Sequence, residues 1–186
     1  ESINNLWGLM TNISLGGFGR LGRDLLRPTF NDNDINIISI SDTADKANLI
    51  YLLKYDSIYG KFNAEIEETE KGIVVDGKEI IFNSWKDGNE ADWEKIQTDI
   101  VILATGKPKT KEEVDIHLSK GCKKVIIAST PENFKDIQIY VPGANDENID
   151  FKSNVFSLGS NTANAVAPIL KVLNSEIGVE RAFLTT

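Results

Sequence analysis

A glycine-rich run near the start of the chain has the composition and spacing of a phosphate-binding turn. Gly17, Gly19 and Gly22 fit the pattern G-x-G-x-x-G, follow a short apolar run and open an amphipathic stretch. The first glycine of such a turn permits a tight bend, the second lets the backbone approach a pyrophosphate, and the third lets helix and strand pack closely. A pyrophosphate then sits on free N–H groups at the positive end of the helix. The predicted nucleotide-binding residues of this run are Gly17, Phe18, Gly19, Arg20, Leu21 and Gly22.

An aspartate stands at the expected distance from this turn. Asp42 lies about 20 residues beyond Gly22, at the end of the β-branched run Ile35–Ile40. Its carboxylate would accept hydrogen bonds from ribose hydroxyls, and its charge would repel a 2′-phosphate. The pattern therefore predicts NAD in preference to NADP. The alternative interpretation is a glycine turn with a helix-capping aspartate and no ligand.

Two further strand ends carry small polar residues. Thr105 and Gly106 follow the buried run Asp99–Ala104, and Ser129 follows Lys124–Ala128. In a doubly wound sheet both points lie at the carboxyl edge, where ligands bind. We predict that Thr105, Gly106 and Ser129 contact the cofactor. The alternative is that they are ordinary turn residues at strand ends.

The elements that would position these residues alternate between β-branched runs and amphipathic stretches. This alternation is typical of α/β architecture, and we predict a Rossmann-type, doubly wound and mostly parallel sheet. Asp76-Gly77 is a favoured hairpin pair and predicts an antiparallel connection. The predicted strands are 12–15, 35–40, 62–68, 72–75, 79–82, 99–104, 124–128, 137–141, 154–156 and the start of one at 179–186, and the predicted helices are 20–27 (with Pro28 near its end), 44–53, 111–120 and 162–177.

Composition and charge narrow the function classes. The 186 residues are 41% hydrophobic and 26% charged, which is ordinary for a globular protein with a real core. The net charge of −8 argues against nucleic acid as a partner, since such proteins need a basic surface. No apolar run is long enough to span a membrane, no secretory signal is visible, and the single cysteine excludes an intramolecular disulfide. We therefore expect a cytoplasmic location, no membrane partner and no metal site.

Several collinear segments resemble the glyceraldehyde-3-phosphate dehydrogenase family. Ile13–Arg23 resembles the family's opening I-N-G-F-G-R-I-G-R, and Tyr51–Phe62 is similar to its Y-L-L-K-Y-D-S-x-x-G-x-F. Ala104–Ile127 resembles S-T-G…H-L…G-A-K-K-V-I-I, and Ala167–Asn174 resembles L-A-P…K-V-I-N. The resemblance implies a homotetramer, NAD as hydride acceptor, and oxidative phosphorylation of a triose-phosphate aldehyde through a cysteine thioester.

One departure from the family decides the functional expectation. The family nucleophile sits in S-C-T-T-N, and the matching residues here are Ser160-Asn161-Thr162-Ala163-Asn164, so Asn161 occupies the cysteine position. A carboxamide offers no nucleophilic lone pair at neutral pH, whereas a helix N-terminus generates thiolate from cysteine. Cys122 precedes a predicted strand at a family alanine position, where a structural role is expected. Thiol-dependent aldehyde oxidation is therefore expected to be impaired, and whether the protein is an enzyme stays open.

Neighbouring residues keep part of the family pattern. Ser160 and Thr162 match positions that contact substrate or inorganic phosphate, so a phosphorylated aldehyde or phosphate is the expected small-molecule partner. Helix capping is the alternative role for both.

The predicted nucleotide site also departs from the family. Gly16 and Ser41 replace two asparagines, and Lys107-Pro108-Lys109 stands where the family often places an aromatic or apolar side chain against adenine. NAD is therefore expected to bind more weakly or through different adenine contacts. His117 matches a family histidine on a surface helix, distant from the chemistry.

The resemblance also suggests a division into domains. We expect an N-terminal extension at 1–11, an NAD-binding Rossmann domain at 12–158, and the truncated start of an α+β catalytic domain at 159–186, because family members continue for roughly 150 residues more. Three functions follow: an NAD-binding homologue with a binding or regulatory role, an active NAD-dependent oxidoreductase that acts on an aldehyde without a covalent thiol, or a structural partner subunit that no longer binds nucleotide.

Overall fold

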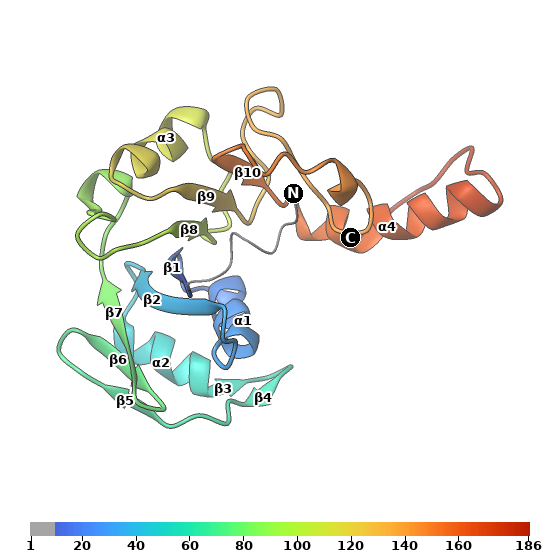
Figure 1. Ribbon diagram of the computed structural model, residues 1–186. Coiled ribbons are helices and arrows are strands. Elements are labelled where there is room, and N and C mark those ends of the chain that lie inside the picture. Colours follow the sequence, from blue (N-terminus) through green and yellow to red (C-terminus); the bar gives the residue numbers. More distant parts are fainter. Residues whose placement is uncertain (1–9) are drawn as a thin grey trace.

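The computed structural model describes residues 10–186, which are built around one large mixed sheet with helices on both faces (Figure 1). The expected N-terminal extension falls almost entirely on residues 1–9, outside the described residues. The strands are β1 (Thr11–Gly16), β2 (Ile35–Ser41), β3 (Tyr55–Asp56), β4 (Gly60–Lys61), β5 (Ile66–Glu68), β6 (Gly72–Val75), β7 (Lys78–Asn83), β8 (Ile100–Leu103), β9 (Lys124–Ile127) and β10 (Val155–Ser157). The helices are α1 (Arg20–Thr29), α2 (Lys46–Lys54), α3 (Lys111–Ser119) and α4 (Asn161–Glu176), with 3-10 turns η2 (Gly88–Glu90) and η3 (Asp146–Asn148).

The strand order of the large sheet is β10-β9-β8-β1-β2-β7-β6-β5. The strands from β10 to β7 run parallel, while β6 and β5 are added antiparallel at one edge. The chain runs outward from β1 through β2 and then returns to place β8 on the other side of β1. The carboxyl ends of β1 and β8 therefore flank a reversal of strand order, which is where α/β sheets bind ligands.

The core lies on both faces of this sheet because parallel strands bury alternate side chains on opposite sides. In the register of β1 with β8, Leu15 pairs with Ile102 on one face, while Val101 and Leu103 point to the other. Helices α1 and α2 cover the first face, and α3 covers the second. The predicted Rossmann-type, doubly wound fold is thus present.

The predicted hairpin forms at Asp76-Gly77, where both residues have positive φ angles of 44° and 81°. One pairing was not expected, because β7 also joins β2 in parallel and so belongs to the central sheet. The predicted strand 62–68 is shorter than expected, since only Ile66–Glu68 pairs with β6.

Two other strand predictions were wrong. Residues 137–141 make a single bridge from Ile139 to Ser157 and form no strand, because the neighbouring turns leave no room for a continuous ladder. Residues 179–186 have no regular structure, since no strand among the described residues lies beside them to accept their hydrogen bonds. Helix α1 runs through Pro28 and ends one residue later, at Thr29.

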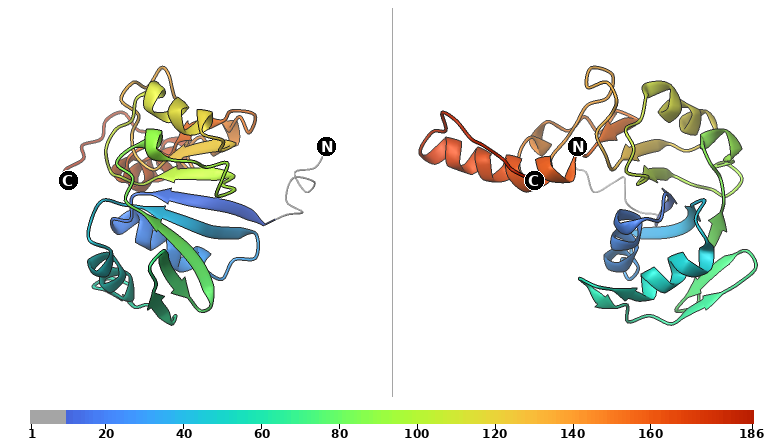
Figure 2. Two further views of the ribbon diagram at one scale, coloured as in Figure 1. Left: turned by 90° about the vertical axis from the view of Figure 1, so that its left-hand side faces the viewer. Right: turned by 180° about the vertical axis from the view of Figure 1, so that it is seen from behind.

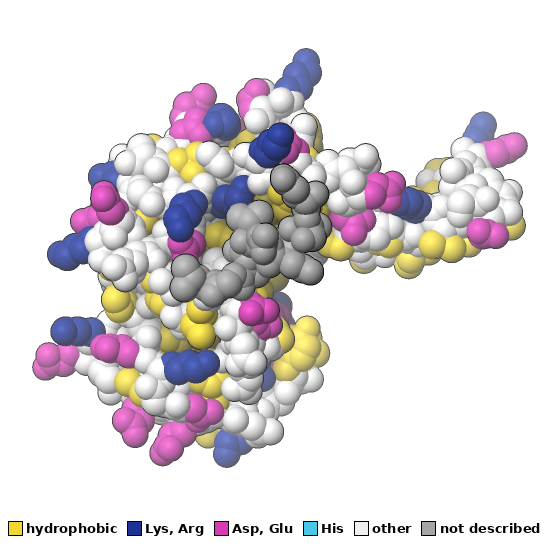
Figure 3. Space-filling model, in the orientation of Figure 1, with side chains coloured by type: hydrophobic (Ala, Val, Ile, Leu, Met, Phe, Trp, Pro, Cys, Tyr) yellow, Lys and Arg dark blue, Asp and Glu magenta, His cyan; other side chains and the backbone are white. Residues whose placement is uncertain are grey.

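The last helix stands apart from the sheet. Figure 2 shows α4 projecting from the body of the molecule. None of its side chains is buried, and Ile169, Val172 and Ile177 are each at least 60% exposed. In the space-filling view its apolar side chains lie along one edge of the projecting helix (Figure 3).

Candidate nucleotide-binding site

The glycine turn connects the carboxyl end of β1 to α1, and each glycine has a distinct steric reason to be there. Gly17 has a φ of 98°, and a Cβ on it would lie 2.9 Å from the backbone of Ala104 and Thr105. A Cβ on Gly22 would lie 2.3 Å from the Gly17 carbonyl oxygen, so only glycine lets α1 pack this closely on the turn. A Cβ on Gly19 would meet no atom within 4 Å. Gly19 therefore faces open space, as expected where a ligand approaches the backbone.

The start of α1 offers free donors beside this open space. Gly19 is the N-cap residue and supplies no side-chain hydrogen bond, and the first turn of the helix contains no acidic residue. The leading N–H groups are thus left for an anion, which the helix dipole also favours. Buried Arg23 braces the turn by donating a 2.9 Å hydrogen bond to the Phe18 carbonyl oxygen.

Asp42 follows β2 and fixes the turn from the other side. Its Oδ2 accepts a 2.7 Å hydrogen bond from the Phe18 N–H, and its Oδ1 accepts one of 2.8 Å from the Ala44 N–H. Each carboxylate oxygen has a second lone pair, so both can still accept from ribose hydroxyls. The ligand-binding and structural roles considered for Asp42 are therefore compatible with one another.

These elements enclose a cavity of about 320 Å³ at the carboxyl edge of the sheet. A second cavity of about 180 Å³ adjoins it and extends between η2 and α3 as far as Trp93 and His117. The mainly polar lining of the larger cavity, with Trp85 as its one large apolar side chain, fits the adenosine and pyrophosphate part of a dinucleotide. The larger cavity is lined by Gly17, Gly19, Ser41, Asp42, Thr43, Trp85, Lys86, Ala104, Thr105, Lys107 and Lys109.

The predicted residues divide into those that line this cavity and those that support it. Gly17, Gly19, Asp42 and Thr105 line it directly. Gly22 and Phe18 do not line the cavity but support the turn that does. Gly22 lets α1 pack against the turn, and the buried Phe18 donates its backbone N–H to Asp42. Gly106, with a φ of 73°, lets the chain turn away after β8, whereas the side chains of Arg20 and Leu21 are exposed.

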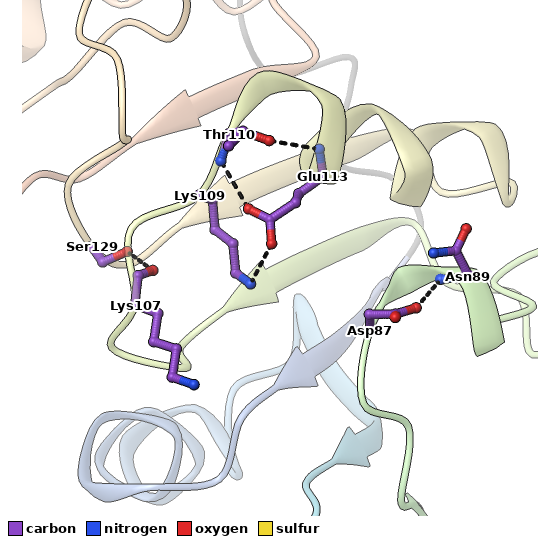
Figure 4. Close-up of polar contacts among 7 residues, drawn as sticks. All are labelled: Asp87, Asn89, Lys107, Lys109, Thr110, Glu113 and Ser129. Carbon is purple, nitrogen blue, oxygen red and sulfur yellow. Dashed lines mark hydrogen bonds and ion pairs between the residues drawn. The ribbon is translucent and has the colours of Figure 1, made fainter.

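Ser129 supports the loop that follows β8. Its hydroxyl donates a 3.0 Å hydrogen bond to the Lys107 carbonyl oxygen (Figure 4). Thr110 and Glu113 then form a reciprocal capping box that starts α3. The loop carrying Lys107 and Lys109 is therefore held at both ends.

An aromatic wall was missed by the sequence interpretation. Trp85 lines both cavities and meets Trp93 edge-on at 5.2 Å between ring centroids. Trp85 follows β7, and only the parallel pairing of β7 with β2 brings it to the carboxyl edge. The sequence signal that could have identified Trp85 was its position shortly after a predicted strand. The hairpin at Asp76-Gly77 had indicated that this strand was antiparallel and therefore not part of the parallel sheet.

His117 differs from its expected place on an exposed surface. The imidazole is buried, stacks on Trp93, and accepts a 3.1 Å hydrogen bond at Nδ1 from the Trp93 indole N–H. Burial lowers the pKa of His117 to about 4, so the ring is neutral at pH 7. His117 lines the smaller cavity. Its Nδ1 lone pair is already used by the Trp93 indole N–H, so Nδ1 cannot accept a proton as a general base without breaking that hydrogen bond.

The residues at the start of α4 lie outside both cavities. Ser160 is the N-cap, and its Oγ accepts a 3.0 Å hydrogen bond from the Ala163 N–H. Asn161 is exposed, and its Oδ1 accepts from the N–H of Thr162. Helix capping therefore accounts for Ser160, while phosphate binding by Ser160 and Thr162 stays a prediction.

The parallel sheet, the glycine turn and the cavity at the strand-order reversal together define a dinucleotide-binding domain. Comparison with known proteins narrows this class. Residues 11–111 match the family model described as glyceraldehyde 3-phosphate dehydrogenase, NAD binding domain. The chain belongs to the glyceraldehyde-3-phosphate dehydrogenase family, and NAD is the cofactor of this domain.

Individual relatives agree with this assignment. The chain is 40% identical to glyceraldehyde-3-phosphate dehydrogenase 1 of Bacillus cereus over 178 residues, covering 95% of this chain and 53% of the relative. It is 38% identical to glyceraldehyde-3-phosphate dehydrogenase of Geobacillus stearothermophilus, with 96% and 53% covered, and 37% identical to that of Thermotoga maritima, with 95% and 53% covered. The chain thus spans about half the length of the curated relatives it matches.

Proposed function

We propose that the protein is an NAD-binding member of this family in which thiol-dependent aldehyde oxidation is impaired, and that it has a binding or regulatory role. The observation that carries the proposal is Asn161 at the first position of α4, within a segment that resembles the family's S-C-T-T-N. An amide at this helix start cannot attack an aldehyde, because its nitrogen lone pair is delocalised into the carbonyl group. The helix dipole that would stabilise a thiolate here has no thiol to act on.

The single cysteine does not replace the missing group. Cys122 is buried beneath α3, and its thiol donates a 3.3 Å hydrogen bond to the His117 carbonyl oxygen. Burial raises the pKa of the Cys122 thiol to about 11, so almost no thiolate forms at neutral pH. The hydroxyl of Ser160, which precedes Asn161, already accepts a hydrogen bond as the helix cap, and no hydrogen bond to a basic side chain is present for it among the described residues.

The test measures NADH formation by the full-length protein with glyceraldehyde 3-phosphate, NAD and inorganic phosphate. We expect no detectable turnover, since loss of a covalent nucleophile costs on the order of 10⁶-fold in a well-studied hydrolase. Asn161→Cys is the informative variant and Asn161→Ala its control, because both remove the amide but only the first supplies a thiol. Activity that returns in the cysteine variant alone supports the proposal. Turnover of the unmodified protein at ordinary dehydrogenase rates would favour the thiol-independent oxidoreductase and overturn it.

A further inference from the structure

Lys107 is one of three lysines that line the larger cavity, with Lys86 and Lys109. It lies on the loop after β8 and shares the cavity wall with Gly17, Gly19 and Asp42. Figure 4 shows its side chain extending away from Lys109, in the direction of the helix coloured as α1. The Lys107 side chain therefore shares this cavity with the free N–H groups of the helix start.

The Lys107 ammonium group differs from its neighbour in its partners. Lys109 forms an ion pair at 3.4 Å with Glu113 in the first turn of α3, so its charge has a partner within the protein. Within residues 10–186, no hydrogen bond or ion pair engages the ammonium group of Lys107. Its charge is therefore available to a ligand.

The backbone of Lys107 is nevertheless well fixed. Its carbonyl oxygen accepts the hydrogen bond from Ser129, and beyond it Lys109 bridges to Pro131 on the loop that follows β9. Only the side chain remains free to move, so binding an anion requires the ordering of one lysine side chain and not of a loop. A contact between the Lys107 ammonium group and a bound anion therefore has a small entropic cost to offset.

The chemistry of the cavity identifies the part of the ligand that Lys107 meets. A dinucleotide carries its charge on the pyrophosphate, and the adenine and ribose are neutral. The Asp42 carboxylate at the ribose end attracts hydroxyl groups and disfavours a further phosphate there. We propose that Lys107 binds the pyrophosphate of NAD across the cavity from the N-terminus of α1, adding a charged contact to the backbone donors of the glycine turn.

This inference rests on nucleotide binding in the proposed function and extends it to a specific phosphate-binding residue. The experiment is calorimetric titration of the full-length protein with NAD, NADP, ADP-ribose and adenosine. The variants are Lys107→Gln and Lys107→Arg, and Lys95→Gln is the control. Lys95 is exposed and lines neither cavity, so its replacement removes the same charge from the protein without touching the site.

Lys107→Gln is expected to lower affinity for NAD, NADP and ADP-ribose by about five- to tenfold, with adenosine unchanged. Lys107→Arg should retain affinity because it keeps the charge, and salt should weaken NAD binding more in the unmodified protein than in Lys107→Gln. Equal NAD affinity in Lys107→Gln and the unmodified protein overturns this inference alone. A loss confined to NADP also overturns it, since it places Lys107 at the ribose 2′ position. If the unmodified protein binds none of the nucleotides, the proposed function fails as well.

Discussion

The Asp42 carboxylate accepts a hydrogen bond from the glycine turn and also lines the larger cavity, where we propose that it meets the ribose of NAD. Replacing it by Asn keeps an oxygen for the Phe18 N–H but removes the charge, whereas Ala removes both. We expect both variants to relax the preference for NAD over NADP, because repulsion of the 2′-phosphate is lost. Only Asp42→Ala should also lower the free energy of unfolding, by about 1 kcal/mol. Calorimetric titration and urea unfolding check the two effects, and an unchanged NADP affinity in Asp42→Asn would contradict the account.

His117 gives the folded protein a dependence on acidic pH. Its pKa is about 4 when folded, compared with 6.5 for the free side chain, because burial beside Trp93 disfavours the charged ring. Between these pH values the unfolded chain binds more protons, so stability is fully present above pH 6.5 and is lost as pH falls toward 4, by up to about 3 kcal/mol.

Urea unfolding at several pH values tests this contribution. His117→Gln keeps an acceptor for the Trp93 indole but cannot titrate in this range. The unfolding free energy of the unmodified protein should therefore fall more steeply between pH 6.5 and 4 than that of the variant. Parallel curves for the two proteins would show that His117 titrates normally in the folded state.

At the scale of elements, two glycines of the turn have different roles: Gly22 allows α1 to pack closely on the turn, and Gly19 leaves space for a ligand. Gly22→Ala places a methyl group against the Gly17 carbonyl oxygen and forces α1 away from β1, at a cost of about 1–3 kcal/mol in stability. Gly19→Ala meets open space and should lower stability only by the cost of alanine at a helix N-cap, about 1 kcal/mol or less, while its methyl group obstructs the approach of the pyrophosphate. Thermal unfolding and NAD titration of both variants check this contrast. Equal destabilisation by the two substitutions would show that the turn is not packed as described.

The secondary structure was largely predictable, and the exceptions share one cause. Local patterns located the strands of the central sheet and the Asp76-Gly77 turn, because burial and turn chemistry are encoded over a few residues. The parallel pairing of β7 with β2 depends on a partner about 40 residues away and leaves no local signal. Residues 137–141 and 179–186 have strand-like composition but lack a continuous partner strand, which no local pattern reports.

The same distinction explains what was predictable about the site. The glycine turn and Asp42 are contiguous or regularly spaced motifs, so their placement at one edge followed from the sequence. Trp85 and His117 reach the cavities only through the packing of η2 against α3 and of β7 against β2. Their positions depend on tertiary structure, and His117 in particular has no sequence signal that separates a buried ring from an exposed one.

At the scale of the whole molecule, two apolar surfaces bear on assembly. Tyr51, Ile58 and Tyr59 are more than 60% exposed around the β3–β4 hairpin, and the apolar edge of α4 is uncovered (Figure 3). Exposed apolar patches such as these two surfaces are typical of protein–protein contacts. Among the described residues, no helix is long and apolar enough to cross a membrane. We propose that the full-length protein is a homo-oligomer, with the tetramer that the family resemblance implies as the expected state.

Light scattering tests this proposal. The full-length protein is expected to be oligomeric, whereas the 186-residue chain alone should be unstable or prone to aggregation because α4 exposes its apolar side chains. Tyr59→Lys should weaken oligomers that use the hairpin surface, and Lys135→Glu, on a different exposed loop, serves as a control substitution. A monodisperse monomer of 20.6 kDa that stays stable at high concentration would contradict the expectation for the chain.

The central claim is that this family member has a functional NAD site, which the proposed loss of the nucleophile at Asn161 leaves intact. Its most direct test is calorimetric titration of the unmodified full-length protein with NAD and, separately, with NADP. The account predicts saturable NAD binding that is tighter than NADP binding by more than roughly tenfold, because the Asp42 carboxylate repels a 2′-phosphate. Equal affinity for the two nucleotides, or binding of neither, would contradict it.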